Sequence, residues 1–142
     1  MSEVKQVIVF RHDLLKSLRK GKIAAQVAHA SLGALLTMFN KEKCVDDYDN
    51  TDKYIHCYVN IQPNDILDKW LNGIFTKVCL YVENEEELLA LYEKVKEAKL
   101  PCALITDAGN TEFHGVPTVT CLGIGPWWSK YLDEFTGDLK LF

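Results

Sequence analysis

Residues 22–29, Lys-Ile-Ala-Ala-Gln-Val-Ala-His, form a stretch of mostly small and apolar residues that is typical of a buried helix. Within such a helix Lys22, Gln26 and His29 fall at positions i, i+4 and i+7, and therefore share one stripe. Burying these polar side chains costs desolvation free energy that packing alone does not require. We therefore predict a helix that runs from Lys22 to about Phe39, with its polar stripe facing a cleft.

Apolar runs alternate with helical patterns along the rest of the chain. The segment from Val4 to Arg11 is too apolar for a strand with a solvent-facing side, which indicates a central strand covered on both faces. Three later runs, at 77–82, 102–106 and 118–124, predict further strands. Strands that alternate with helices predict an α/β fold, with a mostly parallel or mixed sheet and helices on both of its faces.

Three residues mark the expected starts of later helices. We expect Asn64 to cap a helix that ends at Asn72-Gly73. Asn84 precedes three glutamates, which favour the N-terminal end of a helix, and Pro101 ends the helix that follows. Pro126 is expected in the first turn of a last helix, where a missing backbone N–H does no harm.

Length and composition indicate an ordinary globular protein. The 142 residues fit one domain, with 48% hydrophobic and 25% charged residues. The chain has no apolar run of about 18 residues that could span a membrane, and its first ten residues alternate like a strand rather than a signal peptide. Five cysteines without a Cys-x-x-Cys pair argue against a disulfide framework and a zinc site. We predict a cytoplasmic protein that does not bind membranes.

The formal net charge of −4 hides an asymmetry between the two parts of the chain. Residues 1–43 hold eight Lys or Arg and three acids, a balance of +5, whereas residues 44–142 hold eight Lys and seventeen acids, a balance of −9. The cations nearest the first helix are Arg11, Lys16, Arg19, Lys20 and Lys22. Such a basic patch on an acidic protein can bind phosphates, and the alternative is a solvated loop with scattered lysines.

Candidate chemistry lies near the ends of the predicted strands, where ligands of α/β sheets usually bind. Asp107 directly follows the run Cys-Ala-Leu-Ile-Thr, as expected of a working carboxylate. Its alternative role is a turn-forming aspartate ahead of Gly109. Thr120 lies within the last strand, and the sequence holds no Gly-x-Ser-x-Gly, His-Glu-x-x-His or P-loop motif. The residues alone therefore indicate a cleft with Lys, Asp and Thr beside a basic patch.

Four segments of the chain together form a specific pattern. They are Lys20 to Ala30 (KGKIAAQVAHA), Leu104 to Thr111 (LITDAGNT), Thr118 to Pro126 (TVTCLGIGP) and Thr136 to Leu141 (TGDLKL). In this order they resemble the archaeal and eukaryotic type of peptidyl-tRNA hydrolase. The resemblance implies one α/β domain over residues 1–142, with a four-stranded mixed sheet flanked by helices on both faces, and often a homodimer.

The resemblance also implies an activity and a site. The reaction would be hydrolysis of the ester between a peptide and the 3′ ribose of tRNA, with peptidyl-tRNA as the partner, no metal and no other cofactor. The residues that it assigns to catalysis are Lys22, Asp107, Thr111 and Thr120. It implies that Gln26 and His29 line this site and bind substrate. From the basic patch we add Lys20 and Arg19 as substrate-binding residues, although Arg19 stands where the family usually has a glycine.

Ester hydrolysis needs an oriented water, a proton acceptor and stabilisation of a developing oxyanion. We expect Asp107, oriented by Thr111, to position the water. Lys22 would stabilise the oxyanion or hold the terminal phosphate, and Thr120 would bond the substrate ester or ribose.

The chain also departs from the family pattern. Asn110 replaces a cation and Glu112 replaces a glutamine, which should weaken phosphate contacts. The stretch at 40–62 is longer than is typical, and we predict that it is an insertion. A non-catalytic tRNA- or protein-binding regulatory module on the same fold is the alternative function.

Overall fold

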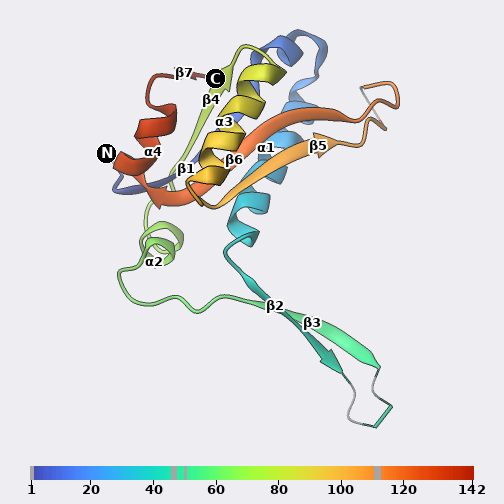
Figure 1. Cartoon of the computed structure of the whole chain (residues 1–142), viewed down its shortest axis with the longest axis vertical. Helices are drawn as coiled ribbons and strands as arrows, with labels where there is room; N and C mark the ends of the chain where they lie inside the picture. The colour runs from blue at the N-terminus through green and yellow to red at the C-terminus, as the bar shows by residue number, and fades with distance from the viewer. Residues whose placement is uncertain (1, 46–47, 50, 111–112) are drawn as a thin grey trace.

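Strand β1 (Val4–Arg11) lies at the centre of a mixed sheet whose strand order is β5-β6-β1-β4-β7 (Figure 1). The computed structural model describes residues 2–45, 48–49, 51–110 and 113–142. β1 pairs in parallel with β4 (Lys77–Val82) and antiparallel with β6 (Thr118–Trp128). β5 (Cys102–Asp107) pairs antiparallel with β6, and β7 (Lys140–Leu141) pairs antiparallel with β4.

The predicted mixed α/β sheet is confirmed, but the number of its strands was wrong. The sheet has five strands instead of four. The additional strand, β7, holds only Lys140 and Leu141, which lie opposite Tyr81 and Leu80 of β4. Two residues are too few to show the alternation from which a strand is predicted.

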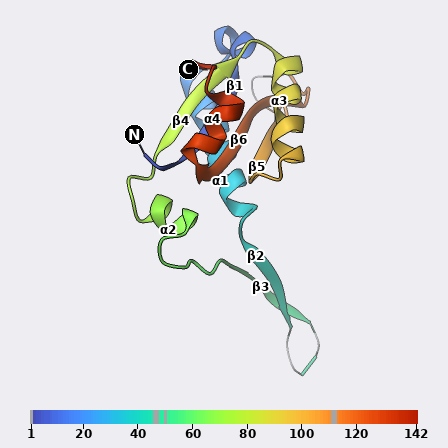
Figure 2. The same ribbon diagram turned by 60° about the vertical axis from the view of Figure 1, so that its left-hand side comes forward.

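Helices cover both faces of the sheet, as expected. They are the 3-10 helix η1 (His12–Ser17) and the α-helices α1 (Lys20–Leu36), α2 (Ile66–Leu71), α3 (Glu85–Glu97) and α4 (Ser129–Thr136). α1 packs on one face, whereas α3 and α4 pack on the other (Figures 1 and 2). None of the helices among the described residues is long and apolar enough to cross a membrane.

The side chains of β1 alternate between two hydrophobic clusters. Val7 and Val9 point to the cluster that includes the α3 residue Leu88. Ile8 and Phe10 point to the opposite cluster, on the α1 side. Both faces of β1 are therefore buried, which explains why its sequence shows an almost continuous apolar run.

Helix α1 lies unusually close to β6. A Cβ atom added to Gly123 would lie only 2.1 Å from the backbone oxygen of Ala30 and 3.2 Å from the Cβ of Ala34. Both alanines are fully buried. The buried side chain of Gln6 adds a polar link, because its Nε2 donates to the carbonyl of Ser31 at 2.9 Å and to that of Gly125 at 3.1 Å.

Two expected helix starts differ from the structure. Pro126 lies inside β6, after a cis peptide bond, because pairing with β1 continues beyond it to Trp128. The last helix therefore begins only at Ser129. At α2 the cap is Asp65, whose side chain accepts a hydrogen bond from the next turn, whereas Asn64 lies outside the helix with a φ of 68°.

The start of α3 is confirmed. Asn84 precedes the first helical residue, and its side-chain oxygen accepts a hydrogen bond from the backbone N–H of Glu87 at 3.0 Å. Glu87 in turn accepts from the backbone N–H of Glu83 at 2.8 Å. These reciprocal bonds satisfy N–H groups that have no partner within the helix.

A β-hairpin projects from the domain beyond the end of α1 (Figures 1 and 2). Its strands are β2 (Asn40–Val45) and β3 (Asp52–Tyr58), which pair antiparallel. The hairpin falls within the stretch 40–62, whose status as an insertion stays a prediction. The sequence had left open whether Tyr54 to Ile61 forms a strand, and the structure assigns its first part to β3.

Substitution of Gly123 by alanine should destabilise the fold, because the new methyl group would collide with the backbone of α1 at Ala30. Overpacking of this kind costs about 1–3 kcal/mol. Gly21 provides the control, since a Cβ there meets nothing within 4 Å, and alanine in a helix is favoured by about 0.5–1 kcal/mol. Urea unfolding should show a loss for Gly123→Ala and none for Gly21→Ala. Equal stability of the two variants would contradict the close packing.

Candidate active site

The start of α1 and the carboxyl end of β5 meet through an ion pair. The Nζ of Lys22 lies 2.6 Å from Oδ2 of Asp107, the last residue of β5. The two side chains are only 15% and 11% exposed, respectively. The pair is therefore screened from water far more than a surface salt bridge, although both groups keep some contact with solvent.

Asp107 accepts hydrogen bonds at both of its carboxylate oxygens. Besides Lys22, Oδ2 accepts from Nε2 of Gln26 at 2.8 Å, and Oδ1 accepts from the backbone N–H of Gly109 at 2.8 Å. The hydrogen bond from Lys22 is the main cause that lowers the pKa of Asp107 below its ordinary value of 3.8. Asp107 is therefore ionised at neutral pH, and it acts both as a turn-forming aspartate and as the partner of Lys22.

The amide of Gln26 connects Asp107 to the interior of the protein. Its Oε1 accepts a hydrogen bond from Oγ1 of Thr120 at 2.6 Å, while its Nε2 donates to Asp107. Gln26 is 1% exposed and Thr120 is fully buried. Because both ends of the amide are engaged, its orientation is fixed. Thr120 lies behind Gln26 and does not reach the surface of the site.

The predicted site residues divide into two groups. The structure brings Lys22, Gln26, Asp107 and Thr120 into one chain of hydrogen bonds. His29 is exposed on α1 and forms no hydrogen bond or ion pair with other described residues. Arg19 and Lys20 are exposed at the start of α1. Thr111 lies outside the described residues.

Two contacts in the structure were not predicted. The ring of Phe113, in the loop between β5 and β6, lies with its centroid 5.8 Å from the Nζ of Lys22. Arg11 was assigned to the basic cluster, but it donates to the carbonyl of Val119 at 2.9 Å and pairs with Asp13 at 2.8 Å. The only available signals were an aromatic residue in a polar loop and an acid two residues after the arginine.

The nucleophiles near the pair are poorly suited to covalent catalysis. The thiol of Cys121 donates to the backbone carbonyl of Gln26, and burial raises its pKa to about 12. The hydroxyl of Thr120 donates to Gln26. Within the described part of the chain, no three His, Cys, Asp or Glu side chains gather as metal ligands would. The arrangement suits a held ammonium that stabilises negative charge and a carboxylate that orients a water.

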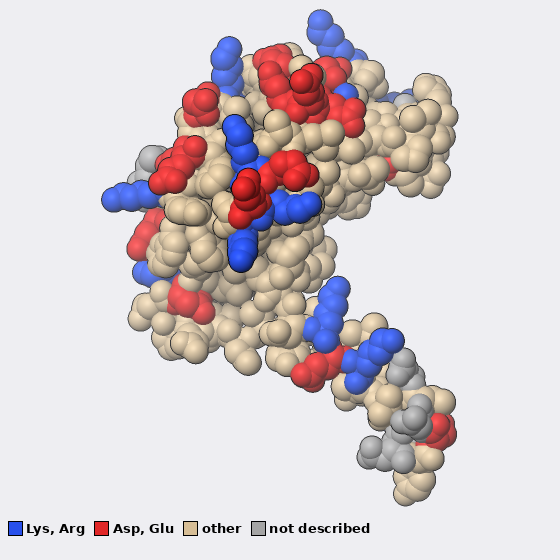
Figure 3. Space-filling view, viewed as in Figure 1, with Lys and Arg blue, Asp and Glu red and all other residues tan. Residues whose placement is uncertain are grey.

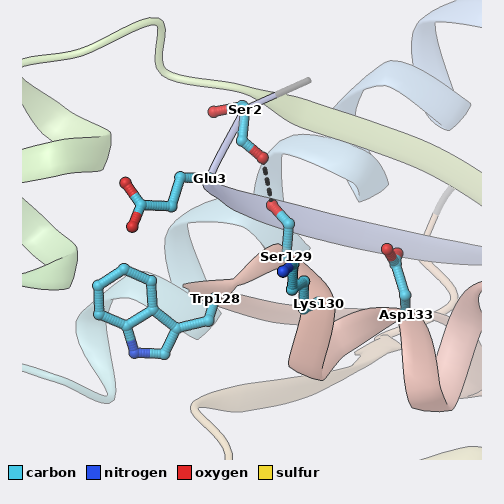
Figure 4. Close-up of a pocket in the computed structure, with 6 residues that line it drawn as sticks. All are labelled: Ser2, Glu3, Trp128, Ser129, Lys130 and Asp133. Carbon is cyan, nitrogen blue, oxygen red and sulfur yellow. Dashed lines mark hydrogen bonds between the residues drawn. The ribbon is translucent and has the colours of Figure 1, made fainter.

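A cavity elsewhere in the molecule contains none of these groups. Its volume is about 560 Å3, and it is lined by Ser2, Glu3, Trp128, Ser129, Lys130 and Asp133 (Figure 4). Its carboxylates already have partners, since Asp133 pairs with Lys5, and Glu3 pairs with Lys69. Size alone therefore does not identify the functional site of this protein.

Thr120→Val should leave the buried Oε1 of Gln26 without its donor, at a cost of about 1–3 kcal/mol in the free energy of unfolding. Urea unfolding of the variant measures this cost. In a Gln26→Leu background the same substitution should cost much less, because the acceptor is gone. An equal cost in both backgrounds would contradict the role of this hydrogen bond.

Asp107→Asn should reduce stability in a pH-dependent way. A carboxylate whose pKa is lowered on folding stabilises the protein above its unfolded pKa, and this stabilisation is lost as the pH falls through the folded value. The difference in unfolding free energy between wild type and variant should be full at pH 7 and shrink below about pH 4. Urea unfolding at several pH values measures it. A difference that does not depend on pH would contradict the ion pair.

Known proteins resemble this chain over nearly its whole length. The family model described as "Peptidyl-tRNA hydrolase PTH2" matches residues 4–142. A peptidyl-tRNA hydrolase of Methanopyrus kandleri is 43% identical, over 96% of this chain and 97% of that protein. One of Sulfolobus acidocaldarius is 36% identical, over 97% and 99%.

A solved structure shows a related fold. It is a protein of unknown function from an Agrobacterium strain, with a TM-score of 0.51 and 13% identity, and the match covers 100% of this chain and 99% of that one. At this identity the match supports the fold alone. The sequence matches go further, because they extend over nearly the whole chain. The chain belongs to the peptidyl-tRNA hydrolase PTH2 family.

Proposed function

We propose that the pair of Lys22 and Asp107 is the centre at which this protein hydrolyses the ester between a peptide and the 3′ ribose of tRNA. The observation that carries the proposal is their 2.6 Å contact at the carboxyl end of β5, supported from behind by Gln26. Family membership supports the reaction, since the curated relatives are named peptidyl-tRNA hydrolases. The products are the free peptide and a tRNA that can be reused in translation.

Lys22 supplies the positive charge of the reaction. Attack of water on the ester carbonyl places a negative charge on the carbonyl oxygen, and an ammonium stabilises that charge best when it is held in place beforehand. Asp107 holds it, and an ammonium has three N–H donors, so it can bond Asp107 and a substrate oxygen together. The limited exposure of the pair strengthens this stabilisation, because less water competes for the charge.

Asp107 positions the attacking water instead of acting as a strong base. Its lowered pKa makes it a weak proton acceptor, but its Oδ1 has a second lone pair beside the one that Gly109 uses. A water bonded there is oriented for attack on an ester beside Lys22. Thr111 stays the predicted residue that orients Asp107. The proton of the water finally goes to the 3′ oxygen of the ribose as the ester bond breaks.

The other predicted residues act around this centre. Thr120 acts as a positioning residue, because its hydroxyl fixes the amide of Gln26 and its burial prevents contact with the ester. Arg19 and Lys20 are exposed cations beside Lys22 that suit the terminal phosphates, and His29 lies further along α1. Action in the cytoplasm, where translation takes place, is part of this proposal, and the homodimer stays a prediction.

Lys22→Ala and Asp107→Ala should each lower kcat by about 10²–10³, because each removes a group that acts on the transition state. The measurement is release of an N-blocked aminoacyl group from tRNA by purified protein. Lys99→Ala provides the control, since this exposed lysine follows α3 and should keep wild-type turnover. Wild-type turnover in both Lys22→Ala and Asp107→Ala would overturn the assignment of the site.

A further inference from the structure

The exposed lysines and arginines of residues 1–43 lie at the two ends of α1. Lys16, Arg19 and Lys20 are exposed at its start, close to Lys22. Lys41 and Lys43 lie in β2, beyond its other end. Since α1 holds 17 residues, the two groups are separated by at least about 25 Å along the helix.

The hairpin separates its charges between two faces. Lys41 lies opposite Cys57 and Lys43 opposite Ile55, so alternation places these four side chains on one face. Glu42 lies on the other face, where its carboxylate accepts a hydrogen bond from the hydroxyl of Tyr58 at 2.8 Å. Of the four side chains on this face, those of Lys41 and Lys43 carry positive charge and those of Ile55 and Cys57 carry none.

Most of the described side chains of the hairpin are exposed to solvent. Tyr54 and Ile55 are 62% and 63% exposed, and the hairpin projects away from the sheet (Figures 1 and 2). An isolated two-stranded hairpin is only marginally stable in water, so burial against a partner would stabilise it. Figure 3 shows a hollow between the hairpin and the lobe at the ends of β5 and β6, with cations on the side of the hairpin that faces the hollow.

We propose, on the basis of the proposed peptidyl-tRNA hydrolysis, that the hairpin face with Lys41 and Lys43 binds the phosphates of the double-helical stem of the tRNA. The 3′ end would lie at Lys22, and the stem would run along the hollow to the hairpin. A distance of about 25 Å along α1 covers several base pairs of a double helix, so one stem can lie between the two groups of cations. Phosphate contacts do not depend on sequence, which suits an enzyme that meets many different tRNAs.

A protein partner fits this face less well. Lysine is depleted in protein–protein interfaces, whereas lysine–phosphate contacts supply most of the sequence-independent affinity for nucleic acid. In the turn of the hairpin, the carboxylate of Asp49 accepts hydrogen bonds from the backbone N–H and the hydroxyl of Thr51.

The test compares Lys41→Gln/Lys43→Gln with the control Lys94→Gln/Lys99→Gln, which removes two exposed lysines in and after α3. Binding of deacylated tRNA is measured between 50 and 200 mM salt. Each lost phosphate contact reduces the slope of log affinity against log salt by about 0.7–0.9. Raising the salt fourfold should therefore weaken tRNA binding by wild type by a factor about ten times larger than the factor for the hairpin variant. The control should show the same salt dependence as wild type.

A kinetic comparison of two substrates shows whether the hairpin acts on the stem of the tRNA or on its 3′ end. With full-length peptidyl-tRNA the hairpin variant should show a raised KM and an unchanged kcat. With an N-blocked aminoacyl ester of a short 3′-terminal oligonucleotide, both constants should equal those of wild type. An unchanged salt slope, or an equal loss on the short substrate, would overturn the proposal.

Two further results separate this proposal from its alternatives. If wild type binds tRNA through the hairpin but hydrolyses neither substrate, the proposed function fails and the tRNA surface stands. If sedimentation shows that wild type is a dimer and that Lys41→Gln/Lys43→Gln is a monomer, the hairpin binds a second copy of the chain. That result would overturn the tRNA surface.

Discussion

The contact between α1 and β6 sets the distances on which the site depends. Because Gly123 has no side chain, the backbone of α1 at Ala30 can lie directly against the strand. One turn earlier in the helix, this closeness allows the amide of Gln26 to reach Thr120 on the same strand. Lys22, a further turn away, then reaches Asp107. A larger residue at position 123 would move all of these groups together.

A chain of hydrogen bonds makes the partly buried charges tolerable. Asp107 accepts from an ammonium, an amide and a backbone N–H, so its negative charge is well compensated. The hydroxyl of Thr120 completes the chain inside the protein. The buried end of this chain, at Thr120 and Gln26, holds the site rigid. At the other end, the ammonium of Lys22 stays near solvent. The arrangement is suited to stabilising a charge that appears only during the reaction.

Much of the site could be predicted because its residues follow simple periodicities. Lys22 and Gln26 are separated by four residues on a helix, and Asp107 ends an apolar strand. His29 could not be placed in the same way. It lies nearly in line with Lys22 on the helix surface but seven residues, or about 10 Å, further along the axis, which is too far along α1 to reach Asp107. The burial of Thr120 depends on how α1 packs against β6, and the local sequence pattern does not predict that packing.

The fold shows the same limit. The central strand, the caps of long helices and the mixed sheet follow from local sequence, as at Asn84. The continuation of β6 through Pro126 depends on pairing with β1, and β7 exists only because β4 offers an edge. These features arise from contacts between distant segments. Tertiary contacts can therefore place a residue in an element that its local sequence does not predict, as with the proline that suits a helix start but lies in a strand.

The projecting hairpin also has a consequence for contacts between molecules of this protein. Both β2 and β3 have an outer edge that is unpaired within the described structure, and such edges are templates for edge-to-edge aggregation between molecules. Lys41, Lys43 and Lys53 lie along these strands. Two hairpins that approach each other would bring these like charges together, and lysines on edge strands oppose this pairing. The same cations would thus keep the free protein dispersed in solution.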